Sequence, residues 1–227
     1  MQSSINDKKQ LWDDFCNRFD VHQKGVPLFE ASDNMVSTFP FGSNGRQVLK
    51  RSSQMDALIS SEVNKVIADY VSNRDEYEGL IYMMYWQDGS NILPLYIGKS
   101  EKLGKSGNLS ENIRNIERNH GKFCRWGYNY AYHIGDLSAV VCPDHEDNKR
   151  TSKYAKWADR LFLGFPDITP KIRKDVFFWM TAWRRGSIGP WKEYGATSLT
   201  FLEYLLIGIA SDVFKDILLN EEGVNRT

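Results

Sequence analysis

Two tyrosines lie on consecutive β-prone segments of the chain. Tyr82 belongs to "EYEGLIYMMYW", residues 76–86, and Tyr96 belongs to "ILPLYIG", residues 92–98. Neighbouring strands can place both phenols on one face of a sheet. A phenol can orient a water molecule, or accept its proton where a nearby cation lowers its pKa from about 10. The pair therefore indicates hydrolytic chemistry, and the alternative is that both rings only pack in the core.

A basic segment follows the second tyrosine. The stretch "NLSENIRNIERNH" predicts a helix, on which Arg114 and Arg118 share one face at i, i+4 spacing. A guanidinium offers a planar fork to the oxygens of a phosphate, and Arg114 is our first choice for this role, before Arg118. His120 is a weaker candidate because it falls on another face, where an exposed helix-end histidine is the alternative.

Glu203 interrupts the apolar segment "FLEYLLIGIA". Carboxylates are seldom buried unless they are paired or bind a metal. Mg²⁺ prefers carboxylate oxygen and keeps several waters, so one protein carboxylate can hold it together with a substrate phosphate. Glu203 is therefore the candidate ligand for Mg²⁺ or Mn²⁺, and the alternative is a surface pair with a lysine or arginine.

These segments together resemble the GIY-YIG nuclease superfamily. The resemblance rests on "GLIY", a turn, "LYIG", a basic helix and a later helix with a glutamate, over residues 77–136 and 197–220. The YIG half matches literally, whereas the GIY half has one extra residue between Gly79 and Ile81. Arg118 stands where family members often have histidine or tyrosine.

The resemblance implies a Mg²⁺-dependent DNA endonuclease that hydrolyses phosphodiester bonds, with a restriction-type enzyme as one form of it. It implies catalytic roles at six positions, and it suggests Asn220 for an asparagine near the end of the glutamate helix, although the spacing is long. The six positions are Tyr82, Tyr96, Arg114, Arg118, His120 and Glu203. A non-catalytic module that retains the fold and binds nucleic acid or another partner is the alternative.

The stretch "NILPLYIGKSEKLGKS" also approaches the phosphate-binding P-loop pattern. That pattern has four residues between its glycines, whereas Gly98 and Gly104 enclose five, which redirects the converging amides. A nucleotide-binding loop is therefore disfavoured. Gly98, Lys99 and Lys105 remain candidates for contact with substrate phosphate, with solvated lysines as the alternative.

Charge is balanced over the whole chain and concentrated locally. The 29 basic and 29 acidic residues give zero net charge, but residues 99–126 hold seven Lys/Arg against three Glu. Arg125 lies in this segment, and Arg184 and Arg185 lie in "WRRGSIGPW", a composition that suits DNA contact or a packed loop. We therefore expect DNA to bind a locally positive face.

The predicted fold class is α/β (α+β), a small mixed and largely antiparallel sheet flanked by helices. Residues 1–75 form a mostly helical N-terminal extension, with a helix over residues 52–73. Residues 76–227 form a nuclease-like domain: the hairpin 76–98, a third strand in "YNYAYHIGDLSAVV", a loop-rich insertion at about 142–195, and a final helix capped by Thr197 or Ser198.

Targeting signals are missing from the sequence pattern. No apolar run reaches the length of a membrane span, the N-terminus has no signal-peptide core, and three scattered cysteines are too few for a disulfide framework. We therefore expect a cytoplasmic protein with DNA as its partner and no membrane, and a homodimer is left open.

Overall fold

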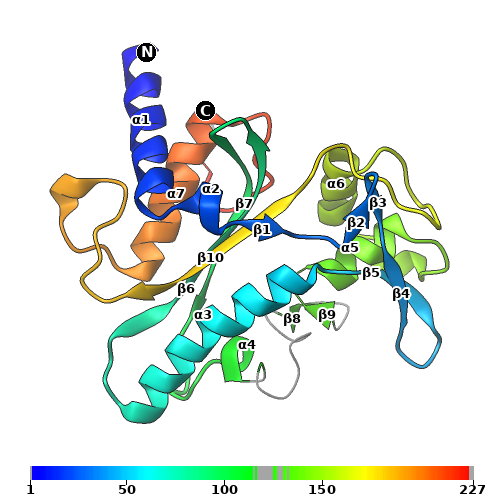
Figure 1. The fold of residues 1–227 in the computed structure, drawn as a ribbon, viewed down its shortest axis with the longest axis horizontal. Coiled ribbons are helices and arrows are strands. Elements are labelled where there is room, and N and C mark those ends of the chain that lie inside the picture. The colour runs from blue at the N-terminus through cyan, green and yellow to red at the C-terminus, as the bar shows by residue number, and fades with distance from the viewer. Residues whose placement is uncertain (1, 115, 117–124, 127–129, 132, 225–227) are drawn as a thin grey trace.

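A computed structural model describes residues 2–114, 116, 125–126, 130–131 and 133–224. The fold is mixed α+β, with a four-stranded antiparallel sheet flanked by helices (Figure 1). This confirms the predicted class, and every strand pair in the described part of the chain is antiparallel. No helix of these residues is both long and apolar enough to cross a membrane.

The elements follow one another as helices, short hairpins and three long strands. The helices are α1 Gln2–Arg18, α2 Val21–Lys24, α3 Ser53–Ser72, α4 Glu111–Arg114, α5 Ile134–Val141, α6 Ser152–Leu161 and α7 Leu199–Val213, with the 3₁₀ turns η2 Asp147–Lys149 and η3 Lys192–Tyr194. The strands are β1 Val26–Pro27, β2 Ala31–Ser32, β3 Met35–Val36, β4 Thr38–Phe41, β5 Arg46–Leu49, β6 Tyr77–Asp88, β7 Asn91–Glu101, β8 Arg125–Trp126, β9 Tyr130–Ala131 and β10 Phe177–Arg184.

The predicted hairpin is confirmed as strands β6 and β7. Tyr82 pairs with Gly98 and Met84 with Tyr96, so both tyrosines lie on one face of the hairpin. The Tyr82 ring covers Gly98, because a Cβ on that glycine would lie 2.7 Å from the ring. The Tyr82 hydroxyl donates to the carbonyl of Lys99 at 3.3 Å. Gly98 lies within strand β7 and not in a loop, so this segment does not form a phosphate-binding P-loop.

Strand β10 lies in the centre of the sheet, although its sequence falls in the segment predicted to be loop-rich. The strand order is β1-β10-β6-β7, and α6 lies in the same 142–195 segment. The run "FFWMTAWR" is apolar on both faces, so it lacks the alternation that indicates a half-buried strand. In residues 1–75, the short strands β1 to β5 accompany three helices, and β1 joins the central sheet.

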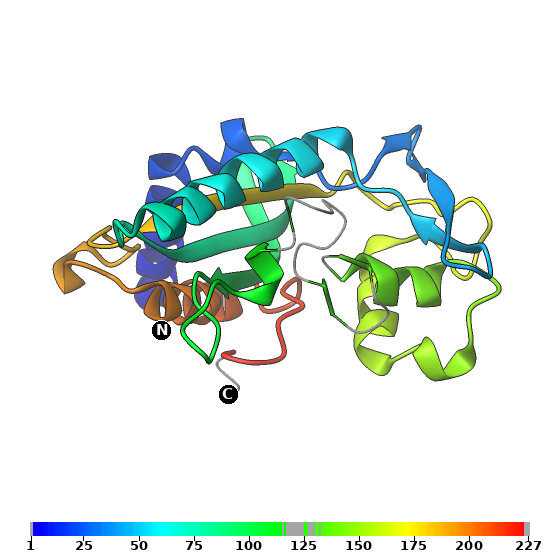
Figure 2. The same ribbon diagram turned by 90° about the horizontal axis from the view of Figure 1, so that it is seen from below.

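Helices lie on both faces of this sheet, with α3 on one face and α7 on the other (Figure 2). A hydrophobic core covers each face. The first core includes Met55, Ile59 and Val63 of α3 together with α5 and α6. The second core packs α1 and α7 against the other face and includes Trp12 and Trp179. Residues 80–86 of β6 are all buried, as a strand between two cores requires.

The third strand predicted in "YNYAYHIGDLSAVV" is wrong for its second half, which forms helix α5. All eight residues of α5 are buried, and His133 precedes it with a left-handed φ of 58°. A run of eight residues is too short to show a clear helical or strand period, and its two valines favoured the strand prediction.

The helices predicted over residues 52–73 and after Ser198 are confirmed as α3 and α7. Ser52 caps α3 by accepting from the Met55 amide at 2.9 Å, and Ser198 caps α7 by accepting from the Phe201 amide. Helix α7 ends at Val213, because the following residues turn back along β7. There the Leu219 amide donates to the Leu95 carbonyl at 2.7 Å.

We expect Gly98→Ala to lower the free energy of unfolding by about 1–3 kcal/mol, because the new methyl group meets the buried Tyr82 ring. Urea unfolding of the variant and the wild type measures the change. The matched control is Gly104→Ala, where the nearest atom lies 3.8 Å from the added Cβ. Equal stability of both variants would contradict the close packing of Tyr82 on Gly98.

Candidate functional site

A pocket beside the outer edge of β7 brings together residues from four parts of the chain. It has a volume of about 340 Å³, and Tyr96 of β7, Lys153 of α6, Glu203 of α7 and the C-terminal Asn220 and Glu222 all line it. We call it the carboxylate pocket. Of the predicted site residues, Tyr96, Glu203 and Asn220 therefore meet at one place.

Glu203 is the half-buried carboxylate of this pocket. Burial raises its pKa above the ordinary value, and the nearby carboxylates of Glu101 and Glu222 act in the same direction. The Lys99 ammonium group and a hydrogen bond with the Lys99 backbone oppose that shift. The pocket thus holds a carboxylate whose charged form is costly in the protein alone.

The backbone of Lys99 connects Glu203 with Tyr82. It forms a hydrogen bond with the Glu203 carboxylate, and its carbonyl accepts one from the Tyr82 hydroxyl at 3.3 Å. The Tyr82 ring itself is 1% exposed and stacks on Phe178 with ring centroids 6.1 Å apart. Tyr82 shares the hairpin face of Tyr96, but among the two only Tyr96 lines the pocket.

Lys153 supplies the pocket's positive charge, and it was missed in the sequence. Its ammonium nitrogen lies over three aromatic rings, 5.7 Å from Tyr96, 5.6 Å from Tyr154 and 5.7 Å from Trp157. Such cation–π contacts orient a long, flexible side chain. The available sequence signal was the i, i+4 spacing of Lys153 and Trp157 in a helical segment.

His133 lies behind these rings and is a buried core histidine. Its Nδ1 is 2.6 Å from the Tyr154 hydroxyl, and its ring packs against Tyr96 and Trp157 at centroid distances of 5.1 and 5.0 Å. Burial, with a smaller effect of the Lys153 charge, lowers the pKa of His133 to about 3. Its imidazole is therefore neutral at physiological pH and supports the position of Tyr96.

Asn220 is committed to the edge of the sheet. Its side-chain oxygen accepts from the Ile97 amide at 3.0 Å, and its side-chain nitrogen donates to the Ile97 carbonyl at 2.9 Å. The side chain thus replaces a missing neighbouring strand. Asn220 forms part of the pocket wall, and both the oxygen and the nitrogen of its side-chain amide form hydrogen bonds with Ile97.

Four residues predicted to contact phosphate, Gly98 and Lys99 in β7 and Lys105 and Arg114 after it, do not line the pocket. Lys99 forms an ion pair with Glu101, Arg114 forms one with Glu111, and Lys105 is exposed on a loop. Arg118 and His120 lie outside the described residues. The structure describes the backbone of Arg125, in β8, but not its side chain.

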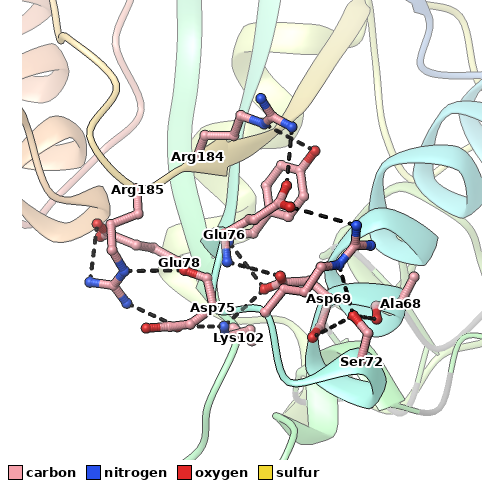
Figure 3. Close-up of polar contacts among 11 residues, drawn as sticks. Ala68, Asp69, Ser72, Asp75, Glu76, Glu78, Lys102, Arg184 and Arg185 are labelled. Atoms are coloured by element: carbon pink, nitrogen blue, oxygen red, sulfur yellow. Dashed lines mark hydrogen bonds and ion pairs between the residues drawn. The ribbon is translucent and has the colours of Figure 1, made fainter.

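Arg184 and Arg185 lie at another end of the sheet, in a network of ion pairs (Figure 3). Arg184 pairs with Glu76 at 3.1 Å, and Arg185 pairs with Asp75 at 3.2 Å and with Glu78 at 3.8 Å. Acidic partners therefore neutralise much of the positive charge that the sequence suggested for DNA contact.

The same network connects α3 with the beginning of α7. Lys102 pairs with Asp69 of α3 at 3.0 Å and with Asp75 at 2.8 Å (Figure 3). Glu78 accepts a hydrogen bond from the Leu199 amide, the first residue of α7, at 2.7 Å. The network thereby positions the helix that carries Glu203.

The donor set of the pocket fits a hard divalent cation bound together with substrate. The described residues contain no cluster of three or more His, Cys, Asp or Glu side chains that could hold a metal by themselves. Glu203 and Glu222 offer oxygen donors, and Mg²⁺ commonly uses one or two carboxylates plus substrate phosphates and water. The residues therefore fit Mg²⁺ or Mn²⁺ better than zinc, which needs three or four protein ligands.

No protein-family model, curated protein or solved structure matches this chain. A functional assignment must therefore come from the pocket and from the sequence motifs.

We expect Glu203→Gln to raise the melting temperature at pH 7 and to leave it unchanged at about pH 4. A folded-state pKa above the ordinary 4.5 means that the fold prefers the protonated acid, so wild-type stability falls as pH rises through that raised value. The neutral amide removes this loss. Calorimetry at both pH values checks the result.

Glu193→Gln, in the exposed turn η3, is the matched control and should melt with the wild type at both pH values. A Glu203→Gln variant that is less stable than the wild type at pH 7 would show that the carboxylate is compensated in the folded protein.

Proposed function

We propose that this protein is a DNA endonuclease of the GIY-YIG type that hydrolyses phosphodiester bonds with the help of Mg²⁺ or Mn²⁺. The observation that carries the proposal is the meeting of Tyr96, Lys153 and Glu203 in one pocket, although β7, α6 and α7 are far apart in the sequence. A phenol, a cation and a carboxylate are the groups that this hydrolysis uses.

Each side chain has a distinct role in this proposal. Glu203, assisted by Glu222, holds the divalent ion, which when bound supplies Lewis-acid stabilisation of the phosphate and the leaving oxygen. The Tyr96 hydroxyl orients the attacking water. Lys153 binds a phosphate oxygen of the scissile group, and its three aromatic rings keep it aimed at the pocket.

Tyr82 acts through the backbone in this scheme. Its hydroxyl holds the Lys99 carbonyl, and the same residue's backbone bonds Glu203. Tyr82 is therefore a positioning residue for the metal ligand, while Tyr96 is the tyrosine that contacts water. This division of roles explains why both tyrosines of the resemblance lie on one hairpin face but at different depths.

Two buried cysteines, Cys16 and Cys142, are free thiols. Free thiols suit the reducing cytoplasm that we propose as the location of this protein. With zero net charge overall, DNA binding depends on local positive charge such as Lys153.

We expect Glu203→Gln to bind DNA but not to cut it. The amide keeps the shape of the side chain while removing the charge that holds the divalent ion. Conversion of supercoiled plasmid to nicked or linear forms measures cutting, with Mg²⁺ and with chelator, and a gel-shift assay measures binding.

Glu193→Gln is again the control and should cut like the wild type. Cutting by Glu203→Gln near the wild-type rate under saturating Mg²⁺ would refute the metal assignment. DNA binding by a wild-type protein that never cuts would favour the non-catalytic module.

We expect Lys153→Ala to lower kcat/KM for cleavage by about 10- to 100-fold, as for loss of one hydrogen bond to a charged group. Lys174→Ala is a matched control, because Lys174 also lies over an aromatic ring, 5.5 Å from Trp86, but outside the carboxylate pocket. Equal rates for the two variants would remove Lys153 from the mechanism.

A further inference from the structure

A second, larger recess adjoins the carboxylate pocket. It has a volume of about 600 Å³ and lies between α1 and α7, with Leu11, Trp191, Tyr204, Gly208 and Ile209 among its walls. We call it the apolar recess. Tyr204 and Gly223 line both hollows, so the two are neighbours along α7.

Aromatic rings stand uncovered at the rim of the apolar recess. Trp191 is 46% exposed and Tyr204 is 56% exposed. Trp191 also contacts Tyr194, whose ring centroid lies 5.4 Å away. Exposed flat rings beside a recess provide a surface on which another planar ring can stack.

Gly208 of α7 lines the recess without a side chain. Glycine inside a helix is less stable than alanine, yet apart from its chain neighbours and the adjacent backbone of α7, no atom lies within 4 Å of the position that a Cβ on Gly208 would occupy. Packing within the chain therefore does not require this glycine. Its absent side chain leaves room for a ligand to approach the helix closely.

We propose that the apolar recess binds an unpaired nucleobase of the substrate, next to the phosphate held in the carboxylate pocket. This inference rests on the proposed function and defines its substrate class as DNA with a base outside the double helix. Glu203 lines the carboxylate pocket, and the next residue, Tyr204, lines both hollows. A phosphate in the carboxylate pocket therefore lies next to a base in the apolar recess. Stacking on aromatic side chains accepts any base.

The volume of the recess suits a small planar group. About 600 Å³ falls within the range of about 300–1,000 Å³ that small-ligand sites have. The ion pair of Lys8 and Asp212 lies at the wall and offers polar groups to the edge of a base.

The test measures binding in the presence of chelator, so that cleavage does not enter. One DNA hairpin carries a single unpaired 2-aminopurine, and a second hairpin of the same length is fully paired. We expect the wild type to bind the unpaired form about 5- to 100-fold more tightly. Its 2-aminopurine fluorescence should be quenched by stacking.

Gly208→Leu should fill the recess and bind both hairpins equally, while its melting temperature stays at or above the wild-type value. Trp191→Ala at the rim is a second variant that should weaken the preference without loss of the fold. Gly164→Leu is the matched control, because Gly164 is equally open but lies outside the recess. It should keep the wild-type preference.

Equal affinity of the wild type for the two hairpins, or an unchanged preference in a folded Gly208→Leu variant, would overturn the inference. A wild-type dimer in sedimentation that Gly208→Leu converts to a monomer would also overturn it, by assigning the recess to a second copy of the chain. Preference for the unpaired base without any cleavage would leave this inference standing and refute the proposed function. Cleavage without preference would do the reverse.

Discussion

The fold depends on the burial of strand β6 from both faces and both edges. Residues 80–86 are all buried, and β10 and β7 pair with the two edges of the strand. Each face then carries its own hydrophobic core, so α3, α5 and α6 lie on one side and α1 and α7 on the other. Helices α6 and α7 therefore lie on opposite faces, and their side chains meet in the carboxylate pocket at the edge of the sheet.

That edge belongs to β7, and its backbone groups are occupied in order along the strand. The Leu95 carbonyl accepts from the Leu219 amide, Ile97 uses both of its groups with Asn220, and the Lys99 backbone bonds Glu203. An open strand edge invites pairing with other chains. Here the C-terminal segment and a carboxylate cover it, which places Glu203 at the sheet edge beside Tyr96.

The ion-pair network at the other end of the sheet supports this arrangement. Most of its pairs involve exposed side chains and contribute little to stability by themselves. The Lys102–Asp69 pair is different because both side chains are buried, at 7% and 1% exposure. Removing one partner from a buried pair leaves an uncompensated charge, which is strongly destabilising. This pair therefore ties α3 to the end of β7, while Glu78 ties β6 to the start of α7.

Local patterns in the sequence determined the hairpin, α3 and α7, because the turn at Asp88-Gly89, the cap at Ser52 and the cap at Ser198 are read over a few residues. They also pointed to Tyr96 and Glu203, a phenol on a strand and a carboxylate in an apolar helix. Only the tertiary structure decided that "FFWMTAWR" is a central strand and that Ile134–Val141 is a helix, since neither short run shows a clear strand or helical period. It also decided that Lys153 faces Tyr96 and Glu203, and that Asn220 serves the sheet edge. These last relations join residues separated by tens of positions or more, and such contacts follow from packing rather than from any local pattern.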